Sequence, residues 1–217
     1  MNAATFRFLR ELADNNDRDW FAANRERYER DVREPALEFI ADVGELLDRV
    51  SPHFVADPRR SMFRIHRDVR FSKDKSPYKT NVGIQFRHAA GRDAHAPGFY
   101  LHLDPAGCFA GAGVWHPDAA VLRRIREAIV ARPGDWARAR EPGRGWRLGG
   151  DELKRPPRGF DPAHEFVDDL RRKDFIALRP LTQKQVCSAA LALEYVGMCA
   201  DAKPFVEFLC QAAGVES

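Results

Sequence analysis

The sequence lacks the residues and runs that mark several large classes of protein. It has only four cysteines and three methionines in 217 residues, and no C-x-x-C pair. Neither a zinc ribbon nor a thioredoxin-type redox pair is therefore indicated. No apolar run reaches the roughly 18 residues of a membrane helix, so we expect no membrane association. The first residues lack the apolar core of a signal peptide, which predicts a cytoplasmic chain with reduced cysteines.

Familiar catalytic motifs are absent as well. The sequence contains no G-x-x-x-x-G-K-[ST] loop, no G-x-S-x-G elbow and no H-E-x-x-H helix. No G-x-G-x-x-G opens a helix after a strand. The seven histidines show no clustered spacing, so we predict no metal site. The cofactor, if the protein has one, is unknown from the sequence.

The charge of the chain is unevenly distributed. Lys and Arg number 35 against 32 Asp and Glu, giving a net charge of +3. Residues 59–79 hold eight of the cations and only two carboxylates, a local charge of +6. The rest of the chain therefore sums to −3. A charge concentrated in one segment predicts a local contact with an anion rather than a generally basic surface.

The apolar pattern predicts an α+β fold in a single domain, residues 1–217. Alternation with a period of two predicts strands over 62–71, 82–86, 99–103 and 108–115. We therefore expect an antiparallel sheet of about four or more strands, roughly residues 60–116, covered by N-terminal and C-terminal helices. Residues 133–160 are rich in Pro, Gly and Arg, and this composition predicts a surface loop with little regular structure.

The charged segment also carries a resemblance to a known family. Its pattern is Arg64-x-x-Arg67-Asp68-x-Arg70-Phe71-x-x-x-Lys75-x-x-Tyr78. This pattern resembles the signature of the bacterial domain-of-unknown-function family 2461. Further similar stretches are Asn15–Tyr28, Gly98–Tyr100, Gly111–Pro117 and Leu170–Phe175. The resemblance implies a bacterial protein with one domain, and supplies neither an activity nor catalytic residues.

The side chains of the charged segment indicate its chemistry directly. On a strand, Arg64, His66, Asp68 and Arg70 would share one face, about 6.6 Å apart. The planar fork of arginine suits phosphate and carboxylate because it donates two parallel hydrogen bonds. Asp68 would hold His66 or an arginine in position, or act as a base if burial raised its pKa. Asp68 and His66 are the candidate catalytic residues.

The candidate ligand-binding residues surround that row. They come from the strand itself, from the Ser72–Lys79 loop after it, and from the polar face of a neighbouring strand. They are Arg64, Arg67, Arg70, Lys73, Lys75, Tyr78, Lys79, Tyr100 and His102. Together they predict a compact pocket for a phosphate or carboxylate, formed by the Arg64–Lys79 strand and loop.

Other interpretations of the same residues stay open. A run of Lys and Arg is often only a solvated surface, and Arg67 could be a structural residue paired with a carboxylate. Asn16 could cap a helix or reach the pocket. The segment could instead bind nucleic acid or an acidic protein, but a pI of about 8.7 favours a small anionic ligand. The sequence does not decide whether the protein is an enzyme, nor its oligomeric state.

Overall fold

One antiparallel sheet forms the centre of the computed structural model, which describes residues 1–90 and 96–215. Its strands run in the order β1-β2-β3-β4-β6-β5, and each pairs antiparallel with its neighbour. The strands are β1 (Phe54–Val55), β2 (Val82–His88), β3 (Gly98–Leu103), β4 (Cys108–Val114), β5 (Arg147–Gly149) and β6 (Phe175–Leu181). The predicted α+β class is confirmed.

The helices come before and after the central strands. The N-terminal helices are α1 (Ala3–Asp14), α2 (Arg18–Ala23), α3 (Arg25–Tyr28) and α4 (Glu34–Leu47), with a π-helical turn η1 (Glu29–Arg33) before α4. The later helices are α5 (Ala119–Ala131), α6 (Pro133–Ala139), α7 (Val167–Leu170), α8 (Gln183–Val186) and α9 (Leu191–Ala213). No helix in the described part of the chain is long and apolar enough to cross a membrane.

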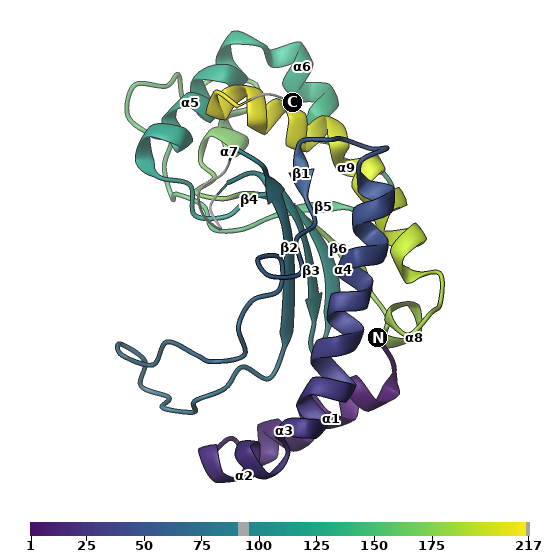
Figure 1. Cartoon of the computed structure of the whole chain (residues 1–217). Coiled ribbons are helices and arrows are strands. Elements are labelled where there is room, and N and C mark those ends of the chain that lie inside the picture. The colour runs from purple at the N-terminus through teal and green to yellow at the C-terminus, as the bar shows by residue number, and fades with distance from the viewer. Residues whose placement is uncertain (91–95, 216–217) are drawn as a thin grey trace.

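The sheet is covered by helices on one face. Long helices α4 and α9 lie along it, while α5 and α6 gather at one end and α1 to α3 at the other (Figure 1). Val82, Ile84 and Phe86 of β2 are buried, and the Phe86 ring packs against Phe39 of α4 and Tyr195 of α9. Successive side chains alternate between faces, so Gly83, Gln85 and Arg87 lie on the other face, which we call the open face.

The charged segment is not a regular strand, which corrects the prediction for residues 62–71. Residues 62–80 form an extension that we call the arm, and it projects from the sheet as a long loop (Figure 1). Its two sides form an isolated bridge between His66 and Tyr78 in place of a continuous ladder, and a second bridge joins Met62 to Ile84 of β2. A side-chain oxygen of Asp68 accepts the backbone N–H of Arg70 at 3.3 Å, a turn contact rather than a strand contact. Arg64, His66, Asp68 and Arg70 therefore do not form one straight row.

Residues 133–160 contain more regular structure than predicted. Pro133 occupies the first turn of α6, where a missing N–H costs nothing. The Trp136 ring in this helix is fully buried against Phe175 and Phe208. Further on, β5 pairs with β6, with Arg147 opposite Leu178. One large buried ring and one edge strand thus bind this stretch to the body of the protein, despite its glycines and prolines.

Candidate anion-binding site

The arm is attached to the N-terminal helices by a small number of contacts. The Asn16 side chain donates to the carbonyl oxygen of Tyr78 at 3.0 Å and accepts the N–H of Tyr78 at 3.0 Å. The Tyr78 ring is buried and stacks on Phe21, with centroids 4.1 Å apart. Asn16 therefore contacts the arm. The sequence alone did not decide between this role and that of a helix cap. The ring of Tyr78, predicted as a ligand contact, packs among these helices.

Asp68 and Arg70 form an exposed pair. The guanidinium of Arg70 donates from Nε and Nη2 to the two carboxylate oxygens of Asp68, at 3.0 and 2.7 Å. These hydrogen bonds lower the pKa of Asp68 to about 2. A carboxylate with so low a pKa is a weak proton acceptor near neutral pH. The sequence allowed Asp68 to pair with His66 or with an arginine, and in the structure it pairs with Arg70.

Three further cations of the arm differ in how they are held. Arg67 forms an ion pair with Asp74 and donates to the carbonyl oxygen of Ser76 at 3.3 Å, which holds the arm's turn closed. Lys75 Nζ donates to the carbonyl oxygen of Val69 at 2.9 Å. Lys73 is exposed. Arg67 is thus paired with a carboxylate, which was the structural interpretation of this residue from the sequence.

Lys79 differs from Lys73 and Lys75 in its burial, and the exposed Arg64 lies near it. Lys79 is half-buried, and its Nζ donates to the carbonyl oxygen of Arg64 at 2.9 Å. Burial lowers the pKa of Lys79, and the nearby charge of Arg64 lowers it further. Across residues 1–90 and 96–215, no carboxylate forms an ion pair with either side chain. The positive charges of Lys79 and Arg64 therefore repel each other, and neither side chain has a carboxylate ion-pair partner among the described residues.

A polar cavity of about 400 Å³ lies beside Lys79. It opens between the end of α1 and the base of the arm. Its lining comprises Ala13, Asn16, Arg67, Asp74, Ser76, Tyr78, Lys79, Thr80 and Asn81. Because Arg67 neutralises Asp74, the charge that remains in this lining is that of Lys79. Three of the predicted ligand-binding residues, Arg67, Tyr78 and Lys79, thus contribute to one cavity.

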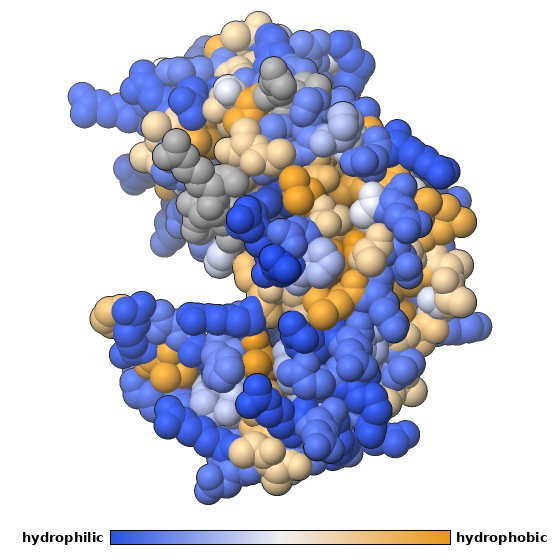
Figure 2. Space-filling view, viewed as in Figure 1, coloured by the Kyte–Doolittle hydropathy of each residue, from blue (hydrophilic) through white to orange (hydrophobic). Residues whose placement is uncertain are grey.

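The remaining predicted residues lie on the open face or at its edge. Tyr100 and His102 of β3 are half-buried there, and the Tyr100 hydroxyl lies 3.0 Å from His102 Nδ1. Burial raises the pKa of Tyr100 to about 12 and lowers the pKa of His102. The molecular surface is hollowed between the part that carries the arm and the upper part of the molecule (Figure 2). His66, by contrast, is exposed near Phe21 and Tyr78, on the side of the arm that faces the helices.

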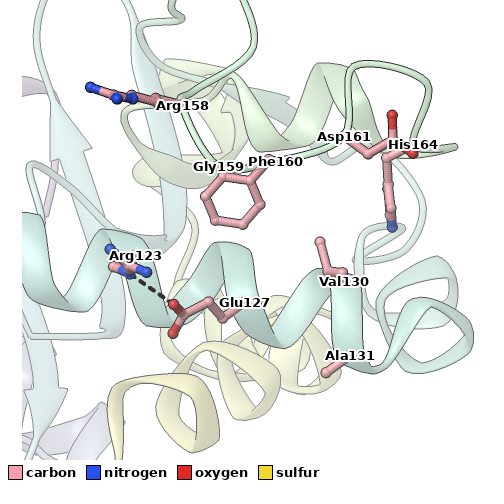
Figure 3. Close-up of a pocket in the computed structure, with 9 residues that line it drawn as sticks. All are labelled: Arg123, Glu127, Val130, Ala131, Arg158, Gly159, Phe160, Asp161 and His164. Atoms are coloured by element: carbon pink, nitrogen blue, oxygen red, sulfur yellow. Dashed lines mark hydrogen bonds and ion pairs between the residues drawn. The ribbon is translucent and has the colours of Figure 1, made fainter.

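A second cavity, of about 290 Å³, lies between α5 and residues 158–164. The Phe160 ring lies over α5, and the side chain of Arg158 points away from it (Figure 3). Arg123 and Glu127 at its wall neutralise each other at 2.7 Å. The charges of Arg158 and Asp161 also offset each other in this lining, so it has no excess of positive charge and is the weaker candidate for an anion.

One pair of polar residues was missed by the sequence analysis. Buried Asp174 accepts the backbone N–H groups of His116 at 2.8 Å and Asp151 at 3.0 Å, and its carboxylate lies 3.1 Å from His116 Nδ1. His116 has a φ of +48°, in the left-handed region. The two residues are 58 positions apart and meet because β4 pairs with β6. The sequence signal was the presence of both in stretches similar to the family, Gly111–Pro117 and Leu170–Phe175.

These features define a class: an α+β protein with one open sheet face and a cationic arm at its edge. The family model described as "Conserved hypothetical protein (DUF2461)" matches residues 4–208. The chain therefore belongs to this family of unknown function. The comparison with curated proteins gives no match. Within the described residues, no three His, Cys, Asp or Glu side chains group as metal ligands would.

Proposed function

We propose that the protein binds a small ligand carrying a phosphate or a carboxylate, at the base of the arm where Lys79 meets Arg64. One observation carries the proposal, namely a half-buried ammonium next to a second cation, without a carboxylate ion-pair partner in the described part of the chain. Such an arrangement is costly when empty, and a bound anion removes much of that cost. The polar cavity next to Lys79 supports the proposal because it offers room and hydrogen-bonding groups.

The arm's other cations would act at longer range. Arg67 and Arg70 already have carboxylate partners, and Lys75 donates to a carbonyl oxygen. They and Lys73 would raise the local positive potential and the rate of encounter with the anion. We propose direct contact for Lys79 and Arg64.

The proposal is one of binding, and proton transfer by Asp68 and His66 remains a prediction. A reducing, cytoplasmic environment is part of the proposal, and it is supported by four free cysteines, three of them buried.

Calorimetric titration with inorganic phosphate and pyrophosphate tests the proposal. We expect Lys79→Ala to weaken binding at least tenfold, Arg64→Ala to weaken it several-fold, and Lys79→Arg to retain most of it. Arg59→Ala is the matched control, because Arg59 is an exposed cation of the same basic segment outside the arm. A protein that binds neither anion, or a Lys79→Ala variant with wild-type affinity, would contradict the proposal.

The pH dependence gives an independent check. A bound anion favours charged Lys79, so affinity should fall as the pH rises through the lowered pKa of Lys79 toward 10.5. Lys79→Arg should bind the same anion with a flatter profile, because arginine stays charged in this range.

A further inference from the structure

A group of aromatic side chains lies beside Lys79. Phe63, Tyr100, His102 and Phe109 form what we call the aromatic platform. The ring centroids of Phe63 and Tyr100 are 6.2 Å apart, and those of Tyr100 and Phe109 are 5.9 Å apart. His102 and Phe109 are stacked at 4.7 Å with an interplanar angle of 18°. The platform therefore continues from the arm across β3 to β4.

The platform rings lie down over the sheet instead of standing away from it. A Cβ atom on Gly83 would lie 2.7 Å from the Tyr100 hydroxyl and 2.9 Å from a ring carbon of Phe63. Only glycine leaves room for both rings so close to β2. Phe63 remains 37% exposed, and Tyr100, His102 and Phe109 are half-buried. A flat aromatic ligand could therefore cover partly exposed ring surface here.

The edge of the platform carries a free hydrogen-bonding atom. The Tyr100 hydroxyl is hydrogen-bonded to Nδ1 of His102, whereas Nε2 of His102 has no hydrogen-bond partner within the described residues. Burial lowers the pKa of His102, which favours the neutral imidazole. A neutral imidazole can donate to or accept from the polar edge of a heterocycle.

The cation of the proposed anion site touches this platform directly. Lys79 Nζ lies 5.5 Å from the centroid of the Phe63 ring. An anion held by Lys79 and a ring lying on the platform would thus be neighbouring parts of one molecule. No helix of the described residues covers this face, and the surface is hollowed in this region (Figures 1 and 2).

We propose that the ligand is a free nucleotide, with its base on the aromatic platform and its phosphate at Lys79 and Arg64. This inference rests on the function proposed above and specifies the rest of the ligand. A sugar phosphate would satisfy the cations but has no π-face for the rings. A nucleic-acid strand needs a row of available cations, whereas Lys79 adjoins the platform and two further cations of the arm, Arg67 and Arg70, are paired with carboxylates.

Titration of the full chain with five probes tests the assignment. The probes are inorganic phosphate, ribose 5-phosphate, adenosine, AMP and an oligoadenylate of about eight nucleotides. We expect AMP to bind at least about tenfold more tightly than either phosphate lacking a base, because stacking adds to the ionic contact. Equal affinities of AMP and inorganic phosphate would overturn the inference and leave the proposed function standing. Failure of every phosphate-bearing probe would overturn both.

Variants of the platform locate the base. Phe63→Leu keeps an apolar side chain at a partly exposed position and removes the ring, so it should lose most of the advantage of AMP over phosphate. Tyr100→Leu should do the same, and both variants should weaken the binding of AMP by a larger factor than the binding of inorganic phosphate. Phe71→Leu is the matched control, because Phe71 is an arm aromatic that is 95% exposed and contacts Arg70.

Two other outcomes would overturn the nucleotide assignment. One is loss of the AMP advantage in Phe71→Leu with retention in Phe63→Leu, which would place the base on the outer arm. The other is an oligoadenylate that binds more than about tenfold tighter than AMP with a steep salt dependence, which would indicate a single strand. Should Tyr100→Leu fail to fold, Phe63→Leu and the comparison of probes still decide.

Discussion

Asn16 and Tyr78 exchange two hydrogen bonds of 3.0 Å across 62 positions of the chain. A side-chain amide here takes the place of a neighbouring strand, giving one donor and one acceptor to the backbone of the arm. This contact fixes where the arm leaves the helices, and Lys79 follows directly after it. The position of the proposed anion site therefore depends on an asparagine outside the basic segment.

Asn16→Ala should loosen the arm. Both hydrogen-bonding groups of Tyr78 would lose their partner, which we expect to cost about 1–3 kcal/mol of unfolding free energy. Urea denaturation measures this cost, and hydrogen exchange should show faster exchange at the Tyr78 amide. Asn15→Ala is the control, because the Asn15 side-chain amide donates to the carbonyl oxygen of Glu11 in the preceding helix and has no bond to the arm among the described residues. Equal effects of the two variants would contradict the role given to Asn16.

Asn16→Asp makes a sharper version of this test. The introduced carboxylate keeps the acceptor for Tyr78 N–H but faces the Tyr78 carbonyl oxygen without a proton to donate. The folded state should then raise the pKa of that carboxyl above its usual value of about 3.9. A raised pKa contributes stability that is present below about pH 3.9 and is lost as the pH rises through the folded value. Relative to Asn16→Ala, this variant should therefore be more stable in acid than at neutral pH.

Tyr78→Phe should leave phosphate binding unchanged, although the sequence predicts Tyr78 as a ligand contact. The ring is buried against Phe21, and phenylalanine keeps that stacking. Tyr78→Ala should instead destabilise the protein by about 3–5 kcal/mol through the cavity it leaves. Thermal unfolding and phosphate titration of both variants separate packing from ligand contact. Tenfold weaker phosphate binding by Tyr78→Phe would restore Tyr78 as a ligand contact.

The difference between what the sequence predicts and what the structure shows has local physical causes. Strands β2, β3 and β4 follow from alternation because one face of each is buried. The same alternation over 62–71 does not produce a strand. The Asp68 carboxylate accepts the backbone N–H of Arg70 in a local turn, and the Arg67 guanidinium donates to the carbonyl oxygen of Ser76 on the other side of the arm. Strand β6 gives a poor signal because it contains Pro180 and because Ile176 and Leu178, which are not buried, are as apolar as the buried residues beside them.

The location of the candidate site can be predicted from the sequence, but the pairing of its individual cations cannot. The excess of positive charge in 59–79 is visible in composition, so its location can be predicted. Which of its cations have carboxylate partners depends on the path of the arm. The contact between Lys79 and Phe63 spans two sides of an irregular loop, and no spacing rule for helices or strands predicts it.

His102 should make the stability depend on pH in a defined direction. Burial lowers the folded pKa of His102 below its usual 6.5, although Asp104 opposes this. A lowered folded pKa contributes stability that is present above pH 6.5 and is lost as the pH falls through the folded value. His102→Gln cannot titrate, so the stability of the wild type relative to this variant should decline over that window. A difference independent of pH, measured by urea denaturation, would contradict the assignment.

Asp169→Asn should be among the most destabilising single substitutions in the upper part of the molecule. Its carboxylate is 1% exposed, accepts from Trp136 Nε1 at 2.8 Å and from Arg172 Nε at 3.0 Å, and lies 2.9 Å from Arg140 Nε. Loss of the charge removes the buried counterion of two partly buried guanidinium groups, which we expect to cost about 3–5 kcal/mol. Asp168→Asn is the matched control, because Asp168 pairs with Arg171 at the surface and should cost less than about 1 kcal/mol. Similar melting temperatures for the two variants would contradict this account.

Substitutions at His116 test its left-handed backbone. Both His116→Ala and His116→Gly remove the imidazole next to Asp174, while the backbone N–H that Asp174 accepts is kept. They differ in backbone cost, since a φ of +48° is unfavourable for alanine and free of strain for glycine. We therefore expect the glycine variant to be more stable than the alanine variant by about 1 kcal/mol. Chemical denaturation of the pair measures the difference.

At Gly107 the opposite order of glycine and alanine is expected. A Cβ atom there would meet no other atom within 4 Å, and Gly107 is not among the residues with positive φ. Alanine at this position should raise the unfolding free energy by about 0.4–1 kcal/mol, because it restricts only the unfolded chain. The order of glycine and alanine should thus be reversed between positions 116 and 107. If alanine were the more stable residue at both positions, His116 would not hold the left-handed conformation in solution, and the arrangement that brings its imidazole to Asp174 would have to be revised.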